Sequence, residues 1–450
     1  MRILARLLIA SSAVFILLQF VRPGIPTPPA TAEFQAPPEI KRIISQDCYS
    51  CHSNERRLLW FDQVVPAYWL VRHDILTARE HLNFSTLGAK PPGAQRAALY
   101  EAVNMVQLGA MPLPDFVALH PGARMTPEDL ASLKSYLAPW SSPLPIATQL
   151  SSAPSTSVSL TAVRPEFNGI PFDPSFESWK LISTTDRGDN NTFRFILGND
   201  IALQAARSGK ITPWPDGARF AKIAWQQQQG ADGFVHPGNF VQVELMIKNA
   251  EQYRSTDGWG WGRWLSVDLH PYGKDAQFVN ECTGCHLPVR GDDSVYTLPI
   301  SSAQLPGNEI VNDNAASLPA SLPYQPLDWK VITLFVDRGS RTTSVLFGND
   351  SALSAALARV SPTESAQPAN YPAGSVLALV TWAQRDDPHW FGARIPDRPL
   401  SVEFVEIAAL AQNTRYRAFT GSGLQETQPT PNTAAQRKDL ILNLQPARLP

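Results

Sequence analysis

Cysteine is scarce in this chain of 450 residues: it occurs only four times, which excludes a fold held together by many disulfides. Neither sign of charge dominates, because 38 Lys and Arg stand against 40 Asp and Glu. The net charge of −2 provides no basic field for binding nucleic acid. Charged residues make up 17%, below the usual share of about 25%, whereas a hydrophobic content of 44% fits a globular protein rather than a disordered one.

A long apolar run begins at the amino terminus, where Leu7–Val21 follows the two basic residues Arg2 and Arg6. This pattern is typical of a secretory signal. A cleavage site of the Ala-x-Ala type occurs at residues 30–32, far beyond the apolar run. We therefore expect residues 1–22 to be an uncleaved anchor in the inner membrane, with the rest of the chain in the periplasm; the alternative is a cleaved signal.

Changes in composition divide the rest of the chain. Proline 40 times in 450 residues is about twice the average usage, and the prolines gather in linker-like stretches. A proline-rich tether over 23–38 precedes the first domain. The predicted order is a mostly helical domain over 38–140, a linker over 141–175, a domain over 176–300, a second linker over 301–325 and a third domain over 326–450.

The third domain repeats the second. The matching segments keep their order and spacing: 179–180 with 329–330, 186–188 with 337–339, 195–200 with 345–350, 214–225 with 371–382, and 241–245 with 400–404. In the first copy, residues 200–207 favour a short helix capped by Asn199 or Asp200 and ended before Gly209. Alternating apolar residues around 220–225 and 240–247 predict strands, so each copy is expected to be an α+β domain with an antiparallel sheet.

All four cysteines lie in two Cys-x-x-Cys-His motifs, Cys48–His52 and Cys282–His286. This motif is typical of c-type haem attachment, in which Cys48, Cys51, Cys282 and Cys285 would bond to haem and His52 and His286 would bind iron. The alternatives are a redox dithiol or a zinc site. A zinc ribbon needs its cysteine pairs about 15 to 20 residues apart, and these pairs are far more widely separated. The sequence therefore predicts two covalently attached c-type haems.

Met111 is the candidate sixth ligand of the first iron. It occurs in the segment Gly-Ala-Met-Pro, some 60 residues after the first motif. Thioether ligation raises the redox potential and closes the iron to substrate, which suits electron transfer. A methionine of the core is the alternative, and the rival ligands are His73, His81 and His120.

The first haem motif lies in a region that resembles a family of small bacterial haem-binding domains. The likeness covers about residues 38–140 and rests on DCYSCHSNE (47–55), VVPAYWLVRHDI (64–75), HLNFS (81–85) and GAMPLPDFVALHPGARMT (109–126). This resemblance implies an α-helical domain similar to cytochrome c.

The second haem motif lies in a region that resembles cytochrome P-460, over about residues 176–300. The matching stretches are FRFILGND (193–200), PWPDGARFAKIAW (213–225), VQVELMIKNAEQY (241–253), GWGWGRW (258–264) and ECTGCH (281–286). The resemblance implies a mostly β dimer that oxidises hydroxylamine towards nitric and nitrous oxide and binds NO. It also implies a lysine bonded to the porphyrin edge, and the family's lysine corresponds to Lys222.

The residues alone support Lys222 less strongly. In its strand Lys222 alternates with apolar neighbours, and such a lysine usually extends its amine to water. A lysine removed from water has a lowered pKa and becomes a nucleophile, which a bond to porphyrin requires. Arg194 and Glu244 are further catalytic candidates, since a carboxylate above the iron could take protons from hydroxylamine. Glu251 is the rival of Glu244, and surface charge is the alternative for both.

Other polar and aromatic residues near these candidates are expected to be structural. We expect His236 and His270 to be structural or exposed, and the aromatic run Trp259–Trp264 to form pocket wall or core.

The second copy departs from this pattern. Leu379 stands in place of Lys222, Ser344 in place of Arg194, and Glu403 in place of Glu244, and no haem motif follows. We therefore expect a haem-less copy that pairs with the first as a second subunit would, which makes a pseudo-dimer within one chain. A docking module or a degenerate remnant are the alternatives.

The leading hypothesis is an exported dihaem oxidoreductase, with an α-helical cytochrome c-like domain followed by two α+β domains. The haem at Lys222 and His286 would oxidise hydroxylamine or a related nitrogen oxide. The haem at His52 and Met111 would pass the electrons to a soluble carrier such as a small cytochrome c. The alternatives are a cytochrome that binds NO or other diatomic gases without turnover and a dihaem peroxidase.

Overall fold

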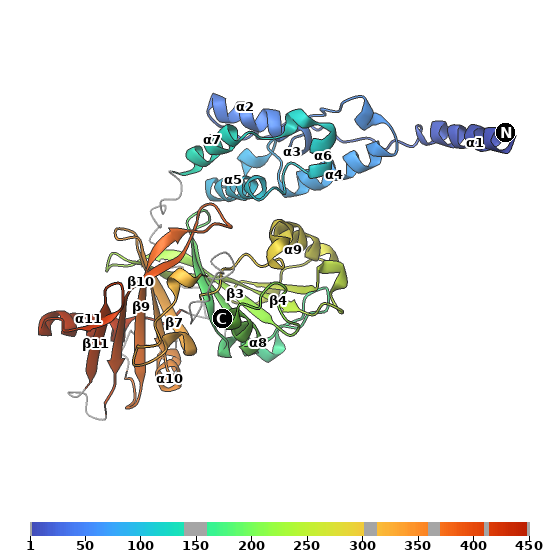
Figure 1. Cartoon of the computed structure of the whole chain (residues 1–450). Coiled ribbons are helices and arrows are strands. Elements are labelled where there is room, and N and C mark those ends of the chain that lie inside the picture. The colour runs from blue at the N-terminus through green and yellow to red at the C-terminus, as the bar shows by residue number, and fades with distance from the viewer. Residues whose placement is uncertain (1, 139–159, 301–312, 359–369, 409–413, 448–450) are drawn as a thin grey trace. The chain divides into compact units, whose positions relative to one another are not determined.

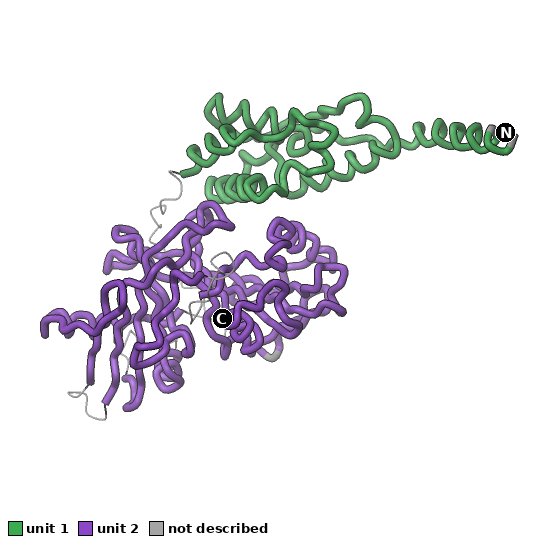
Figure 2. Tube along the Cα trace, viewed as in Figure 1, with its two compact units in different colours: residues 1–141 green, residues 142–450 purple. Residues whose placement is uncertain are grey.

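The computed structural model describes residues 2–138, 160–300, 313–358, 370–408 and 414–447. The chain forms two compact units, residues 1–141 and residues 142–450 (Figure 2). The first is helical and the second is built on an antiparallel sheet (Figure 1). The predicted combination of a helical region followed by antiparallel β structure is confirmed at this level.

The helical unit contains seven α-helices within its described residues. They are α1 (Arg2–Leu18), α2 (Pro38–Asp47), α3 (Tyr49–His52), α4 (Ala67–His81), α5 (Pro92–Gln107), α6 (Pro114–Leu119) and α7 (Pro127–Leu137). The start of α7 is encoded locally, because the Thr126 hydroxyl accepts the backbone N–H of Asp129 and Pro127 occupies the first turn. Across the described part of the chain, no helix is both long and apolar enough to cross a membrane.

The proline-rich segment 23–38 packs on the helices, which corrects its prediction as a tether. Ile25 and Phe34 are buried. The Tyr68 hydroxyl on α4 donates a hydrogen bond to the carbonyl of Pro23 at 2.5 Å, and Arg72 donates one to Gly24. The proline content correctly indicated irregular backbone, but the two large apolar side chains, Ile25 and Phe34, supply enough burial to hold the segment in place.

The described residues of the second unit form one twelve-stranded sheet. Its strands are β1 (Lys180–Arg187), β2 (Thr192–Gly198), β3 (Arg219–Gln229), β4 (Val235–Lys248), β5 (Trp259–Leu265), β6 (His270–Pro271), β7 (Lys330–Asp337), β8 (Thr342–Gly348), β9 (Val376–Asp386), β10 (Ala393–Glu406), β11 (Arg415–Thr420) and β12 (Gln425–Thr427). The helices of this unit are α8 (Asp200–Ser208), α9 (Val279–His286), α10 (Asp350–Ala358) and α11 (Pro431–Asn443). Strands β1–β4 and β7–β10 have the same antiparallel order, each with one helix between its second and third strands.

The two repeats close on each other at two equivalent seams. Strand β4 pairs with β7 through Val235 and Val336, and β10 pairs with β1 through Arg394 and Asp186. The eight repeated strands therefore form a closed ring, and one buried cluster contains side chains of both repeats, such as Trp225 and Trp382. The expectation of two separate α+β domains is corrected: the repeats are halves of one unit with a common core.

Both predicted linkers contribute to that core over their described parts. Ile170 and Phe172, before β1, are buried, as are Ala316 and Leu318, before β7. The rest of these predicted linkers, residues 141–159 and 301–312, lies outside the described residues. Serine and proline in these stretches marked irregular backbone correctly, but composition did not reveal the apolar side chains that pack between the halves.

Local details of the repeat follow the sequence closely. Helix α8 is capped by the Asn199 side chain, which accepts the N–H of Ala202, and Gly209 ends it at φ +68°. Strands β3 and β4 include the segments predicted from alternation. One alignment was shifted by a residue: the hairpin register makes Arg187, opposite Thr192, equivalent to Asp337, opposite Thr342.

Candidate haem sites

Helix α9 presents the second Cys-x-x-Cys-His motif to the outer face of the first half. Cys282 is buried in a cluster with Ile196 of β2 and Phe220 of β3. The Nδ1 atom of His286 lies 2.7 Å from the carbonyl oxygen of Ser294, which leaves Nε2 as the nitrogen that can bind a metal. Burial lowers the pKa of His286 to about 4, so the ring is neutral, as an iron ligand must be.

The loop after the motif is fixed from several sides. The Asp293 carboxylate receives the Lys248 amine at 2.6 Å and the backbone N–H of Trp214 at 2.8 Å. The indole N–H of Trp259 donates to the Asp293 carbonyl at 2.8 Å. The loop therefore holds the Ser294 carbonyl where it orients His286.

A row of charged side chains crosses the same outer face. Strand alternation places Lys222 (β3), Glu244 (β4) and Arg263 (β5) on one side of the sheet, and the register sets them directly opposite one another. The Lys222 amine lies 2.5 Å from one Glu244 oxygen, and Arg263 Nε lies 3.3 Å from the other. Arg194 on β2 lies on the same face. The structure thus brings together all three predicted catalytic residues and adds Arg263.

These groups perturb one another because they are withdrawn from water. Burial lowers the pKa of Lys222 to about 8. Burial also disfavours the Glu244 carboxylate, but the charges of Arg263 and Lys222 outweigh it and lower the pKa of Glu244 to about 2. Burial, together with the charges of Arg187 and Arg263, lowers the pKa of Arg194 to about 9. A chargeable amine, a carboxylate and two guanidinium groups therefore form one compact polar site on an otherwise apolar face.

This charged row lies near the haem motif. Burial raises the pKa of the Cys282 thiol to about 11, and the charges of Arg263, Glu244 and Lys222 act on the same thiol. Two buried donors nearby, Arg194 Nε and Trp261 Nε1, have no hydrogen-bond partner among the described residues. Buried donors are nearly always satisfied, so they indicate room for a polar group.

The donor set fits a haem. The described cysteines form no disulfide, which leaves their sulfur atoms able to form thioethers, His286 offers Nε2, and the ring centres of Trp261 and His286 are 4.5 Å apart. Within the described residues, no group of three or more His, Cys, Asp or Glu side chains could hold a metal ion, so the zinc alternative gains no support.

Three other candidates lie away from the row. Glu251 is exposed on the turn after β4. His270 is exposed beside Asp268, and His236 is paired with Asp232 at 2.8 Å. Trp259 and Trp261 are buried in the apolar cluster that contains Cys282, and Trp264 lies in the shared core. Arg263 was missed because it lies inside this aromatic run, although strand alternation alone would have placed it beside Glu244.

The first haem motif begins at Cys48 and continues through α3. His52 Nδ1 lies 2.9 Å from the carbonyl oxygen of Leu82, so again Nε2 is the nitrogen free to bind iron. Cys48 opens onto an apolar cavity between the helices, lined by Ile40, Ile44, Phe84, Leu99, Ala102, Val103, Val106, Met125, Leu133, Tyr136 and Leu137. A thiol, an oriented imidazole and an apolar cavity fit a haem at this site too.

The sixth ligand of the first site stays a prediction. Met111 is partly buried on the turn after α5, outside the residues that line this cavity, whereas Met125 lines it. Met125 is thus a thioether candidate that sequence reasoning did not single out. His73 and His81 are exposed, and both ring nitrogens of His120 are engaged, with Phe116 O at 3.0 Å and Asp62 at 3.1 Å.

The second half has closed the equivalent site. Leu379 and Glu403 are opposite each other, as Lys222 and Glu244 are, but Leu379 packs in an apolar cluster with Ile441 of α11. Arg437, also on α11, donates to both Glu403 oxygens, at 2.8 and 2.5 Å, and Tyr416 bonds the same carboxylate. The sequence has no cysteine after Cys285. Helix α11 therefore covers in this half the face that α9 covers in the first.

Comparison with protein families agrees with both sites. Residues 13–139 match the model of the haem-binding domain, and residues 174–297 match the model of cytochrome P460. The chain carries a haem-binding domain followed by a cytochrome P460 domain. No curated protein matches the sequence. The two family matches support a haem cytochrome, and the second supports haem redox chemistry.

Proposed function

We propose that this chain is an exported dihaem c-type cytochrome that oxidises hydroxylamine or a related nitrogen oxide. The observation that carries the proposal is the row of Lys222, Glu244 and Arg263 beside the haem motif of α9. The equivalent face of the second half has no such row, so the sheet itself does not need these charges.

At the C-terminal site, Cys282 and Cys285 would bond to the haem and His286 Nε2 would bind its iron. The haem supplies an iron that binds the substrate nitrogen and takes up its electrons. Lys222 is the residue proposed to bond to the porphyrin edge. Replacing an N–H and a C–H bond by an N–C bond releases two protons and two electrons, which an external two-electron oxidant of the peroxide class would have to accept. The lowered pKa of Lys222 favours this bond, because the neutral amine is the nucleophile.

Glu244 is the proposed proton acceptor. Oxidation of hydroxylamine to nitric oxide releases three protons and three electrons, so a base at the site is required. As a bonded nitrogen, Lys222 would no longer carry a full charge, and Glu244 would become a stronger base than it is beside an ammonium group. Arg263 stays paired with the carboxylate and orients it. Arg194 offers an unpaired buried donor to a polar group of the substrate or the haem.

The N-terminal site is proposed to transfer electrons. His52 and a thioether, Met111 as predicted, would bind its iron, and thioether ligation raises the potential above that of an open site. Electrons would pass from the C-terminal haem to this one and then to a soluble carrier such as a small cytochrome c.

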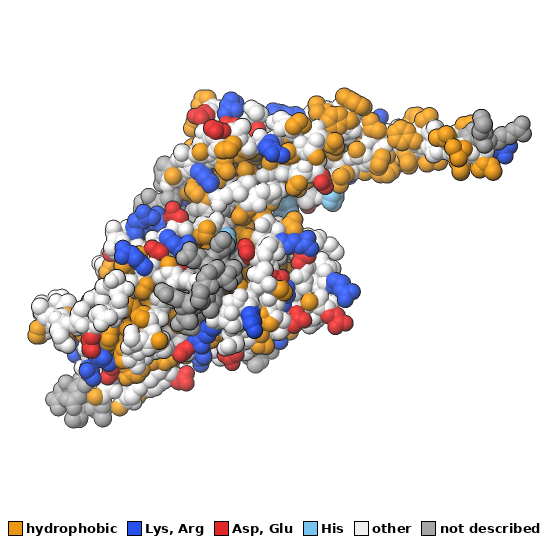
Figure 3. Space-filling model, in the orientation of Figure 1, with side chains coloured by type: hydrophobic (Ala, Val, Ile, Leu, Met, Phe, Trp, Pro, Cys, Tyr) orange, Lys and Arg blue, Asp and Glu red, His pale blue; other side chains and the backbone are white. Residues whose placement is uncertain are grey.

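Attachment to the periplasmic face of the inner membrane is proposed through the N-terminal segment. Apolar side chains cover α1 (Figure 3), and next to its end Trp60 and Trp69 are 77% and 38% exposed. Trp69 donates its indole N–H to the Val21 carbonyl at 2.7 Å, which places this tryptophan at the base of the helix. Exposed tryptophans next to an apolar helix suit a membrane interface.

The paired repeats support a pseudo-dimer within one chain, because the two seams are equivalent.

A second function, binding of NO or another diatomic gas without turnover, is favoured by the ion pair of Glu244 with Lys222. While Glu244 is paired with Arg263 and with the charged Lys222 amine, its pKa is about 2 and the carboxylate is a weak base.

Anaerobic stopped-flow mixing with hydroxylamine tests the proposal. We expect reduction of the haems, and Glu244→Gln should slow it by about a hundredfold, the usual contribution of a general base. Glu251 is an exposed carboxylate from the same region, so Glu251→Gln is the matched control. This control should change the rate of haem reduction by less than about twofold. Reduction of neither haem would exclude hydroxylamine oxidation and leave the gas-binding function.

A further inference from the structure

The proximal side of the C-terminal haem motif contains a tyrosine that contacts both the ligand and the attachment helix. The Tyr296 ring lies 5.1 Å from the His286 ring in an edge-on arrangement. Its hydroxyl donates a hydrogen bond to the carbonyl oxygen of Cys285 at 2.5 Å. Tyr296 therefore touches two residues of the motif at once, and its position affects the orientation of His286.

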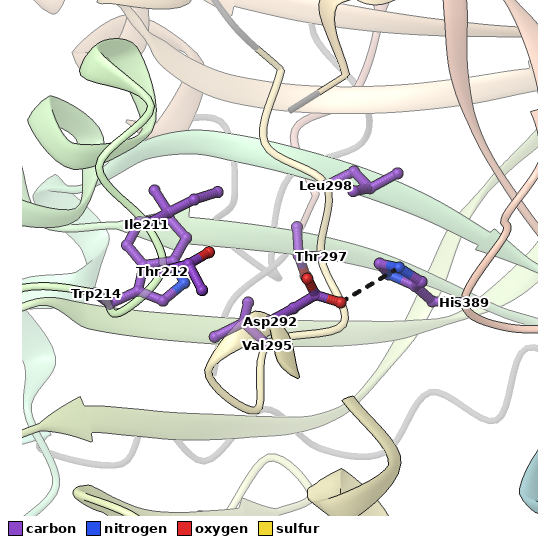
Figure 4. A pocket seen from close by; sticks show the side chains of 8 residues that line it. All are labelled: Ile211, Thr212, Trp214, Asp292, Val295, Thr297, Leu298 and His389. Carbon is purple, nitrogen blue, oxygen red and sulfur yellow. Dashed lines mark ion pairs between the residues drawn. The ribbon is translucent and has the colours of Figure 1, made fainter. Parts of the chain in front are cut away.

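Tyr296 is contacted by the second half, which has no haem motif. The turn between β9 and β10 brings His389 to the first half, where its Nδ1–H donates to the Tyr296 carbonyl oxygen at 2.7 Å. The neighbouring Trp390 packs edge-on against the Tyr296 ring at 5.6 Å. His389 Nε2 also faces Asp292 at 3.8 Å, across a small pocket in front of Trp214 (Figure 4).

The turn is itself rigidly held. The Asp387 carboxylate accepts the backbone N–H of His389 at 2.8 Å. The Arg187 guanidinium lies 4.3 Å from the centre of the Trp390 ring, and the Trp390 indole N–H donates to Asp189 at 3.3 Å. These contacts within the protein hold His389 and Trp390 in place without a cofactor. The two residues can therefore act as a fixed support for Tyr296.

The equivalent turn of the first half makes a contrasting contact. It reaches the second half through Phe234, which stacks on Phe335 at 4.8 Å, and through His236, 5.8 Å from the same ring. Both turns therefore cross a seam, but only the turn with His389 reaches a haem motif. His236 lies near the start of β4 and provides a matched control.

We propose that His389 and Trp390 are positioning residues for the proximal ligand His286, supplied by the half that has no haem of its own. They act through Tyr296 and the loop that carries Ser294. This inference rests on the proposed function only in requiring a haem at Cys282–His286. It gives the second half a role in the redox site and not merely in the fold.

The test compares His389→Ala and Trp390→Leu with His236→Ala in the full-length holoprotein. We expect the amides of 287–298 to exchange about fivefold faster in the first two variants, the factor that corresponds to one hydrogen bond. We also expect a changed absorption spectrum and midpoint potential of the C-terminal haem and an unchanged N-terminal haem. His389→Gln, which keeps a side-chain donor, should restore most of the protection.

Two results would overturn this inference. One is exchange and spectra equal to those of His236→Ala. The other is faster exchange with an unchanged C-terminal haem, because that would make the turn a brace for the loop alone. If His389→Ala does not fold, the comparison of His389→Gln with Trp390→Phe decides by the same readouts. Wild-type protein that carries no haem at Cys282–Cys285, as measured by mass, would instead contradict the proposed function.

Discussion

Positions 222 and 379 are equivalent in the two halves of one sheet, yet their surroundings are opposite. Lys222 faces Glu244 and Arg263 next to a haem motif, whereas Leu379 is buried in an apolar cluster under α11. Across from each stands a glutamate. Glu244 is shared between a lysine and an arginine of its own sheet, while Glu403 is paired with Arg437 from the covering helix.

The difference lies almost entirely on the outward face of the strands. The inward residues next to these positions are alike in the two halves, with Trp225 matching Trp382 and Ala221 matching Ala378, and all four are buried. A closed ring of strands thus tolerates very different outer faces, because strand alternation separates them from the core. One outer face carries a row of ion pairs beside a haem motif, and the other is covered by a helix.

The largest expected effect comes from making the first half resemble the second. The double substitution Cys282→Ser and Cys285→Ser removes the thiols that form thioether bonds, so the C-terminal haem should be lost completely. Intact mass should then fall by one haem, with the N-terminal haem retained. Unchanged haem content would mean that this motif does not attach haem.

The reverse substitution should not build a site. Leu379→Lys places an amine in a cluster with Leu346 and Val405, where Glu403 is already paired, and should destabilise the protein by about 3 kcal/mol. Leu379→Met is the matched control and should cost under about 1.5 kcal/mol. Urea unfolding measures both. Equal stability of the two variants would contradict the burial of residue 379 in an apolar cluster under α11.

A smaller effect is expected at the glutamate of the second half. Glu403→Gln leaves Arg437 without its charged partner and should destabilise by about 1–2 kcal/mol, a reduced figure because Arg437 is a third exposed. Glu426→Gln breaks the surface pair with Arg417 and should have no measurable effect on unfolding. If Glu403→Gln loses no more stability than Glu426→Gln, the packing of α11 does not depend on the Glu403–Arg437 pair.

The smallest expected effect is a shift in the pH dependence of amine labelling at Lys222. In the Cys282→Ser, Cys285→Ser protein, amine labelling of Lys222 followed by mass spectrometry should show a midpoint near pH 8, because burial lowers its pKa. The neutral amine reacts, so labelling rises as the pH rises through this value and levels off above it. A model peptide should show the ordinary lysine midpoint near 10.4. A peptide-like midpoint for Lys222 would contradict its desolvation.

Sequence reasoning was most successful where a local pattern carried the information. The alternation around Lys222 and the capping of α8 by Asn199 were predictable because each depends on neighbouring residues. The repeat located Leu379 and Glu403 correctly, since the strand registers preserve its spacing.

Contacts between distant segments were not predictable in the same way. The common core of the halves, the cover that α11 provides and the hydrogen bond from His389 to Tyr296 join residues far apart in the chain. No periodicity or spacing encodes such pairs. The same limit applies to the choice between Met111 and Met125 as the sixth ligand. The sequence alone does not show which methionine lines the cavity at Cys48, because that depends on how the helices pack.

The most direct test of the central claim is the intact mass and absorption spectrum of the exported protein, beside Lys222→Ala and Lys222→Arg. We expect the mass of two covalent haems in all three proteins. We also expect a red-shifted Soret band in the wild type alone, because Lys222 bonded to the porphyrin would change its electronic structure. An ordinary c-type spectrum, identical in wild type and variants, would contradict the lysine-bonded catalytic site.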